Sequence, residues 1–128
     1  MSRLLLENEA TGKAAQVYGD IQKYFGMVPN FFKAQAAIDA DWLELNWKRL
    51  KHIMLSPEGL DRKTRELIAY AVSAVNQCEY CKAAHENTAR AGGATDRELV
   101  QTQQIVELFC SFNAIADTLN VPLDGKPQ

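Results

Sequence analysis

The amino-acid sequence predicts an all-α protein, a single helical domain of about six helices that spans residues 1–128. Nearly every segment repeats its apolar residues at the period of an α-helix. No stretch alternates apolar and polar residues as a strand does, and the one dipeptide typical of a hairpin turn is Asp124-Gly125, near the C-terminal end. A chain of 128 residues is also long enough to bury one hydrophobic core.

Two helices are expected before the first tryptophan. The first carries an apolar stripe, and Gly26 supplies the left-handed residue that ends it. Pro29 disfavours helical backbone at Val28, so a bend follows, and Asn30 is expected to cap a short second helix. The stripe of the first helix comprises Ala14, Val17, Tyr18, Ile21, Tyr24 and Phe25. The short helix carries Phe31, Phe32 and Ile38.

Two longer helices follow, separated by the turn Ser56-Pro57-Glu58-Gly59. Asp39 or Asp41 is expected to cap the third helix, and the fourth runs from Asp61 to about Asn76. The inward residues of the third helix are expected to be Trp42, Leu43, Trp47, Leu50 and Met54. The fourth is expected to form the central core through Leu67, Ile68, Ala71, Val72 and Val75.

The last two helices are separated by Gly92-Gly93, which stops the fifth. The fifth contains two cysteines and is expected to bury Ala83, Ala84 and Ala91. Thr95-Asp96-Arg97-Glu98 has the pattern of a capping box at the start of the sixth. The sixth is expected to bury Ile105, Leu108, Phe109, Phe112, Ile115 and Leu119.

Composition argues against several classes of protein. The net charge is -2 with Lys and Arg spread among Asp and Glu, so we expect neither a nucleic-acid partner nor a membrane partner. The run Leu4-Leu5-Leu6 is too short for a signal peptide, and no window has the ~20 apolar residues of a membrane span. Three cysteines are too few for a secreted disulfide framework and favour a reducing compartment. We therefore expect a cytoplasmic protein.

The segment from Cys78 to His85 is the most informative part of the chain, and it reads Cys-Glu-Tyr-Cys-Lys-Ala-Ala-His. On a helix, residues 78, 81 and 85 share one face, so two sulfurs and an imidazole converge there. Such a face can carry redox chemistry or bind a metal. If the helix starts at Asn76 or Gln77, both sulfurs lie in its first turns, where the helix dipole favours an anion.

A reactive cysteine must be ionised, and the helix dipole contributes only about 0.3 to 1 kcal/mol, which is less than one pKa unit. An imidazole four residues after Cys81 can take the thiol proton and pair with the thiolate, so we expect Cys81 to be the nucleophile and His85 its base. Cys78 is placed to attack a sulfenic acid on Cys81 and close a disulfide. Glu66 is the acid best placed by sequence to orient His85, although by itself its position favours a surface carboxylate paired with Arg62.

Glu66, followed twelve positions later by the Cys-x-x-Cys-x-x-x-His segment, then Gly92 and a new helix, resembles the alkylhydroperoxidase D-like branch of the carboxymuconolactone decarboxylase family. The resemblance covers about Asp61 to Leu119, and Val28-Pro29-Asn30-Phe31-Phe32 is similar to a motif of uncharacterised peroxidase-related members. It implies a helical bundle that forms homo-oligomers and acts as a thiol peroxidase on a hydroperoxide.

The roles implied by the resemblance fall on four residues. Cys81 reacts with the peroxide, Cys78 resolves, and His85 and Glu66 relay protons. A dithiol reductant, a lipoyl group or a thioredoxin-like protein, regenerates the pair, and no cofactor is implied. The best-known members carry a histidine immediately before the second cysteine, where this chain has Tyr80. Tyr80 is either a proton donor or a packing aromatic.

Other interpretations of the same residues remain open. The protein is a disulfide oxidoreductase without peroxidase activity if the missing histidine is essential. It is a zinc-stabilised helical interaction module if His52 or Cys110 completes a set of four ligands, although we expect His52 on a polar helix face and Cys110 as a small buried apolar residue. A decarboxylase would not need paired cysteines. Apolar stripes on almost every helix, with two tryptophans, also predict a homo-oligomer.

Overall fold

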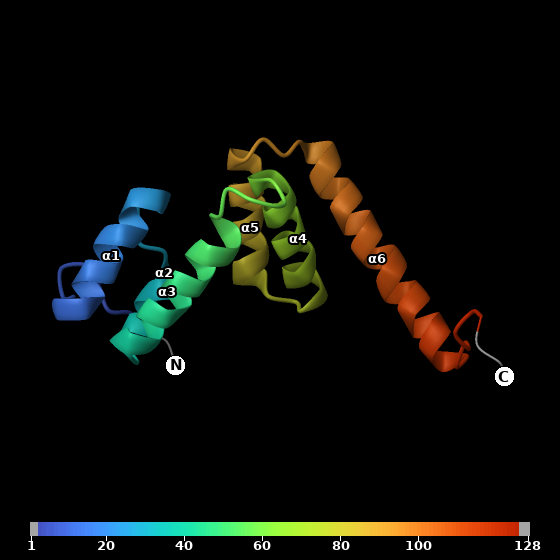
Figure 1. The fold of residues 1–128 in the computed structure, drawn as a ribbon, viewed down its shortest axis with the longest axis horizontal. Helices are drawn as coiled ribbons and strands as arrows, with labels where there is room; N and C mark the ends of the chain where they lie inside the picture. The colour runs from blue at the N-terminus through green and yellow to red at the C-terminus, as the bar shows by residue number, and fades with distance from the viewer. Residues whose placement is uncertain (1–2, 126–128) are drawn as a thin grey trace. The chain divides into compact units, whose positions relative to one another are not determined.

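The computed structural model describes residues 3–125, in which the regular structure consists of six α-helices and no strand (Figure 1). In chain order the helices are α1 (Gly12–Phe25), α2 (Asn30–Ala36), α3 (Ala40–Met54), α4 (Arg62–Val75), α5 (Glu79–Ala91) and α6 (Asp96–Thr118). The predicted all-α class is confirmed. Among the described helices, none is long and apolar enough to cross a membrane.

The chain divides into two compact units, Met1–Ser56 and Pro57–Gln128. In the first unit, α1 and α2 both pack against α3. Trp47 of α3 is 2% exposed, and its ring lies 5.5 Å from that of Phe32 and 5.9 Å from that of Phe25. Its indole N–H donates to Asp20 over 2.7 Å, which satisfies the polar atom of a buried aromatic. The other buried core residues of this unit are Ala14, Val17, Tyr18, Ile21, Val28, Phe32, Ala36 and Leu43.

Two helix ends in the first unit agree with the prediction from the sequence, whereas the cap of α2 and the exposure of Trp42 differ from it. Gly26 ends α1 with φ +71°, and the Asp39 carboxylate caps α3 by accepting from the backbone N–H of Asp41 and Trp42, both as expected. Pro29, with extended backbone, occupies the cap position of α2, and Asn30 is instead the first helical residue. A proline fits there because its fixed φ suits the residue that precedes a helix. Trp42, expected to face inward, is 45% exposed.

In the second unit, α4 and α5 form a close antiparallel pair, with Gly92 at the end of α5 near Lys63 at the start of α4. Asp61 caps α4 by accepting from Thr64 N–H over 2.7 Å. Thr95 and Glu98 form the expected capping box at the start of α6, and Lys63 reaches Glu98 over 2.7 Å, which ties α4 to α6.

Burial in the second unit differs from the sequence prediction. The buried face of α4 is Glu66, Tyr70 and Ser73, and the buried residue of α5 is Ala89. The predicted apolar stripe of α4 is largely open, with Ile68, Val72 and Val75 about half exposed. The reason is that α4 turns its mixed face, not its most apolar face, toward α5.

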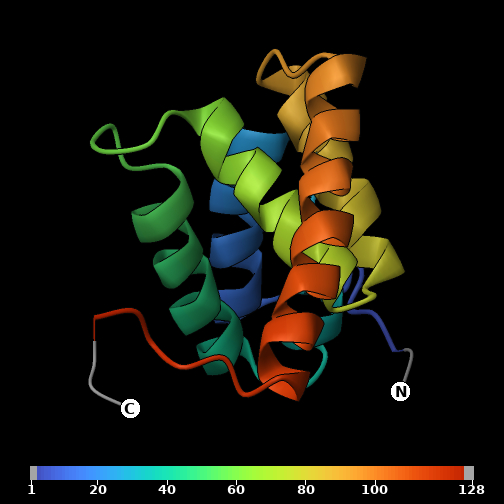
Figure 2. The same ribbon diagram turned by 90° about the vertical axis from the view of Figure 1, so that its right-hand side faces the viewer.

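Helix α6 leaves the α4–α5 pair after its first turns (Figure 1) and continues as one unbroken helix (Figure 2). Leu99 is its one buried residue. The residues that were expected to be buried further along α6 are between 44% and 67% exposed, so that expectation is wrong for the single chain. They are Ile105, Leu108, Phe109, Phe112, Ile115 and Leu119.

Candidate functional site

The turn between α4 and α5 places the first cysteine at the cap position of α5. Asn76 ends α4, and Gln77 adopts left-handed backbone with φ +56°, which reverses the chain. Cys78 N–H then donates to Ser73 O over 3.0 Å, and α5 begins at Glu79, later than the Asn76 or Gln77 start expected from the sequence. The displacement arises because the left-handed turn occupies the residues that were assigned to the helix.

Cys78 and Cys81 are joined by a disulfide, with their Cα atoms 5.3 Å apart, inside the usual range for this bond. Cys78 Sγ also accepts a hydrogen bond of 3.3 Å from the backbone N–H of Cys81, as a capping side chain does. Both cysteines are half-buried. The disulfide therefore spans the first turn of α5 and remains in contact with solvent.

One turn further along α5, His85 lies against Glu66 of α4. His85 Nδ1 is 2.8 Å from Glu66 Oε2, and the Thr88 hydroxyl donates to the same oxygen over 2.6 Å. A carboxylate only accepts hydrogen bonds, so the proton between His85 and Glu66 is assigned to Nδ1. A neutral His85 held in this way carries its lone pair on Nε2, the nitrogen that is able to act as a base.

The environment of Glu66 keeps its carboxyl group ionised. The residue is 8% exposed, so a surface acid paired with Arg62 is not what the structure shows. Burial by itself would raise the pKa of Glu66, but the hydrogen bonds from His85 and Thr88, with the charges of His85 and Arg62, together lower that pKa below its ordinary value. The carboxylate therefore stays negative where it contacts the imidazole.

The structure thus brings together two pairs of the four residues singled out in the sequence: Cys78 with Cys81, and Glu66 with His85. Each pair has one member on α5, Cys81 in the first pair and His85 in the second. Thr88 was not singled out, although its place one turn after His85 on the same helix face was a readable signal.

The remaining candidate ligands lie elsewhere. His52 is exposed on α3, as expected, whereas Cys110 is exposed on α6 and not buried. Within residues 3–125, no group of three or more His, Cys, Asp and Glu side chains is arranged to hold a metal ion.

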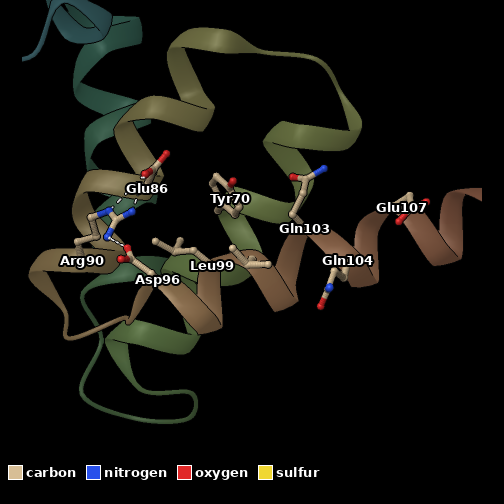
Figure 3. A pocket seen from close by; sticks show the side chains of 9 residues that line it. Tyr70, Glu86, Arg90, Asp96, Leu99, Gln103, Gln104 and Glu107 are labelled. Atoms are coloured by element: carbon tan, nitrogen blue, oxygen red, sulfur yellow. Dashed lines mark hydrogen bonds and ion pairs between the residues drawn. The ribbon is translucent and has the colours of Figure 1, made fainter.

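Two pockets lie beside this part of the second unit. The smaller, of about 380 Å³, opens at the turn between α4 and α5 and includes Cys78 among its lining residues. The larger, of about 500 Å³, lies between α4, α5 and α6 (Figure 3). In it, Tyr70 and Leu99 form an apolar floor, and Arg90 pairs with Glu86 and Asp96 at one end. No cysteine lines the larger pocket, and Cys78 is the one cysteine that lines the smaller one.

Comparison with known proteins agrees with this arrangement. The model of the family described as "Carboxymuconolactone decarboxylase family" matches residues 36–124. The chain belongs to this family. Within the carboxymuconolactone decarboxylase family, its fold is similar to a solved structure of the alkylhydroperoxidase AhpD core from Rhodospirillum rubrum, with a TM-score of 0.91 and 32% identity over 97% of this chain and 93% of that one. The alkylhydroperoxidase D-like resemblance is therefore confirmed.

Curated relatives of this family member include two proteins named alkyl hydroperoxide reductase AhpD. The protein of Rhodococcus erythropolis is 37% identical over 75 residues, which are 59% of this chain and 41% of that protein. The protein of Mycobacterium marinum is 28% identical over 85 residues, which are 66% of this chain and 47% of that protein. The chain spans less than half the length of either relative.

Proposed function

We propose that the protein is a thiol-dependent hydroperoxidase. The observation that carries this proposal is the closed Cys78–Cys81 pair on the helix whose next turn presents His85, with its Nδ1 held by the buried carboxylate of Glu66. Relatives named alkyl hydroperoxide reductase support the reaction class. The solved AhpD core supports the fold that would carry it.

In the proposed cycle, the Cys81 thiolate attacks the outer oxygen of a hydroperoxide. The O–O bond breaks, the alcohol leaves with a proton, and Cys81 becomes a sulfenic acid. The Cys78 thiolate then attacks the Cys81 sulfur, the S–S bond forms, and hydroxide leaves and is protonated to water. An external dithiol, a lipoyl group or a thioredoxin-like protein, returns two electrons and restores both thiols.

His85 and Glu66 are assigned the proton transfers. Nε2 of neutral His85 takes the thiol proton, and the Glu66 carboxylate stabilises the resulting imidazolium through the hydrogen bond to Nδ1. Removal of a proton from Cys81 then leaves a thiolate beside a cation. Tyr80, where the best-known relatives carry a histidine, is 48% exposed, and this relay assigns no proton to it.

Peroxide consumption by the purified protein, with a dithiol as reductant, tests the proposal. Cys81→Ser and Cys78→Ser are expected to abolish turnover, and Cys110→Ser, which removes the exposed cysteine of α6, is expected to retain it. Full turnover by Cys81→Ser would show that the nucleophile is wrongly assigned. A wild-type protein that reduces disulfides but not organic peroxides would instead be a disulfide oxidoreductase.

A further inference from the structure

The smaller pocket gives an external molecule access to one of the two cysteines of the disulfide. It is lined by Ser73, Ala74, Gln77, Cys78, Glu79 and Lys82, with Cys78 as its sole sulfur. Cys81 and His85 are not among these residues. The volume of about 380 Å³ lies within the range of about 300–1,000 Å³ that is usual for pockets that bind small molecules. A small group in this pocket therefore meets Cys78.

The lining of the pocket is polar where it opens to solvent. Gln77, Glu79 and Lys82 are exposed, and they contribute an amide, a carboxylate and an ammonium group. Ser73 is buried, and its hydroxyl proton is already donated to Ala69 O over 2.7 Å. Of these groups, the Lys82 ammonium favours the approach of an anion such as a thiolate. The Ala74 methyl group lines the pocket without adding a polar group.

We propose that this pocket admits the thiol that reduces the enzyme, and that the reductant attacks Cys78 and not Cys81. The inference deepens the proposed redox cycle and rests on it. An external thiolate attacks Cys78 Sγ, a mixed disulfide forms there, and the Cys78–Cys81 bond breaks with its electron pair on Cys81. The second thiol of the reductant then attacks the outer sulfur of the mixed disulfide, which releases Cys78 as a thiolate and the reductant as a disulfide.

The groups around the pair suit this direction of attack. The rate of thiol–disulfide exchange depends on access to the attacked sulfur and on the stability of the leaving thiolate. Access favours Cys78, since it lines the pocket. Cys81 is the better leaving group, because His85, four residues later on α5, returns a proton to its thiolate. In this assignment peroxide and reductant use different sulfurs of the pair.

A trapping experiment tests the site of attack without any peroxide. The wild-type protein is oxidised with diamide, treated with glutathione as the attacking thiol, and quenched with iodoacetamide, which alkylates the sulfur that leaves. Tandem mass spectrometry then assigns each label, because Glu79 and Tyr80 separate the two cysteines. We expect glutathione on Cys78 and the alkyl label on Cys81. Glutathione on Cys81, on both sulfurs or on neither overturns the proposal.

Two substitutions of alanine by leucine test the role of the pocket. Ala74→Leu fills the pocket beside Cys78 and is expected to slow reduction of the disulfide by dithiothreitol about tenfold or more, with unchanged alkylation of the reduced protein. Ala83→Leu adds the same bulk at an exposed position of α5 outside the lining and is expected to leave the rate unchanged. Equal rates for the two variants overturn the role of the pocket.

These outcomes are separable from those of the peroxidase assay. A protein that fails to consume peroxide but carries glutathione on Cys78 would support attack at Cys78 and contradict peroxide as the substrate. A protein that turns over peroxide but carries glutathione on Cys81 would support the proposed function and contradict attack on Cys78 through the pocket.

Discussion

Thr88 is a residue of the candidate site that the sequence analysis did not single out. Its hydroxyl group donates to Glu66 Oε2 over 2.6 Å, the oxygen that also accepts from His85 Nδ1. Two donors on one carboxylate oxygen fix the position of that oxygen and favour the charged form of the acid. Thr88 is therefore a positioning residue that acts on His85 through Glu66.

Replacement of the Thr88 hydroxyl by a methyl group tests this role. Thr88→Val has almost the same shape and is expected to lower the free energy of unfolding by about 1.5–3 kcal/mol, as loss of a hydrogen bond to a charged group does. Alkylation of reduced Cys81 should also shift to higher pH, because a less well held Glu66 stabilises the imidazolium less. Thr88→Ser should restore both quantities. An unchanged pH profile in Thr88→Val would limit Thr88 to a structural role.

The carboxyl group of Glu66 gives stability a defined dependence on pH. Its pKa is lowered in the folded protein, so the native state favours the charged form, and the contribution to stability is present above the ordinary value of 4.5. That contribution is lost as pH falls through the lowered pKa. Urea unfolding followed from neutral pH downward should therefore show a smaller loss of stability in Glu66→Gln than in the wild type. Parallel curves for the two proteins would contradict the lowered pKa.

At the scale of elements, Gly92 lies where the end of α5 comes near the start of α4. A Cβ atom at Gly92 would lie 3.3 Å from Ala89 O and 3.5 Å from Lys63 Cα, and neither backbone atom moves easily. Since Glu66 lies on α4 and His85 and Thr88 on α5, the separation of these helices also sets the hydrogen bonds of the candidate site.

Substitution of two different glycines by alanine distinguishes the effect of close packing on stability from the effect of helix propensity. Gly92→Ala is expected to destabilise the protein by about 1–3 kcal/mol, as overpacking does. Gly19→Ala, inside α1 where no atom lies within 4 Å of the added carbon, is expected to stabilise it by about 0.5–1 kcal/mol. Urea denaturation gives both values. A neutral or stabilising Gly92→Ala would show that the Ala89 carbonyl group moves aside without cost.

The elements themselves were largely readable from the sequence, whereas their buried faces were not. Gly26, Asp39 and the Thr95–Glu98 capping box act locally, through hydrogen bonds within one turn. Gly26 and the capping box were predicted correctly, and Asp39 is one of the two caps expected for α3. Burial depends on which face of a helix meets a neighbour. On α4 the apolar stripe suggested Val72 and Val75, but the partner helix covers Glu66 and Tyr70 instead.

Spacing along the sequence predicts contacts within one helix, so only part of the candidate site could be predicted in this way. The cysteine pair lies within one turn, so its closure was predictable. The contact of Glu66 with His85 joins two helices, and periodicity in either helix leaves their packing undetermined. The left-handed Gln77 also had no clear signal, because glycine is the usual residue at such a position.

At the scale of the whole molecule, the described residues expose apolar stripes on both α4 and α6. The stripe of α6 that includes Phe109 and Phe112 is about half exposed, as are Ile68, Val72 and Val75 of α4. Contiguous apolar surface of this kind marks an interface between proteins. The same residues were predicted from their spacing to be buried, so we propose that copies of this chain bury them together as a homo-oligomer.

Light scattering across protein concentrations measures the predicted assembly. The wild type is expected to have a mass above 14.3 kDa, and a stable interface should bury at least about 1,200 Å². Phe112→Glu places a charge within the exposed apolar stripe of α6 and should shift the mass toward that of one chain. Ala114→Glu adds the same charge about 160° away from Phe112 around the helix, at an exposed position outside the stripe, and should leave the mass unchanged. A wild type that stays at the mass of one chain at every concentration would contradict the homo-oligomer, and the apolar surface of α6 would then require a different partner.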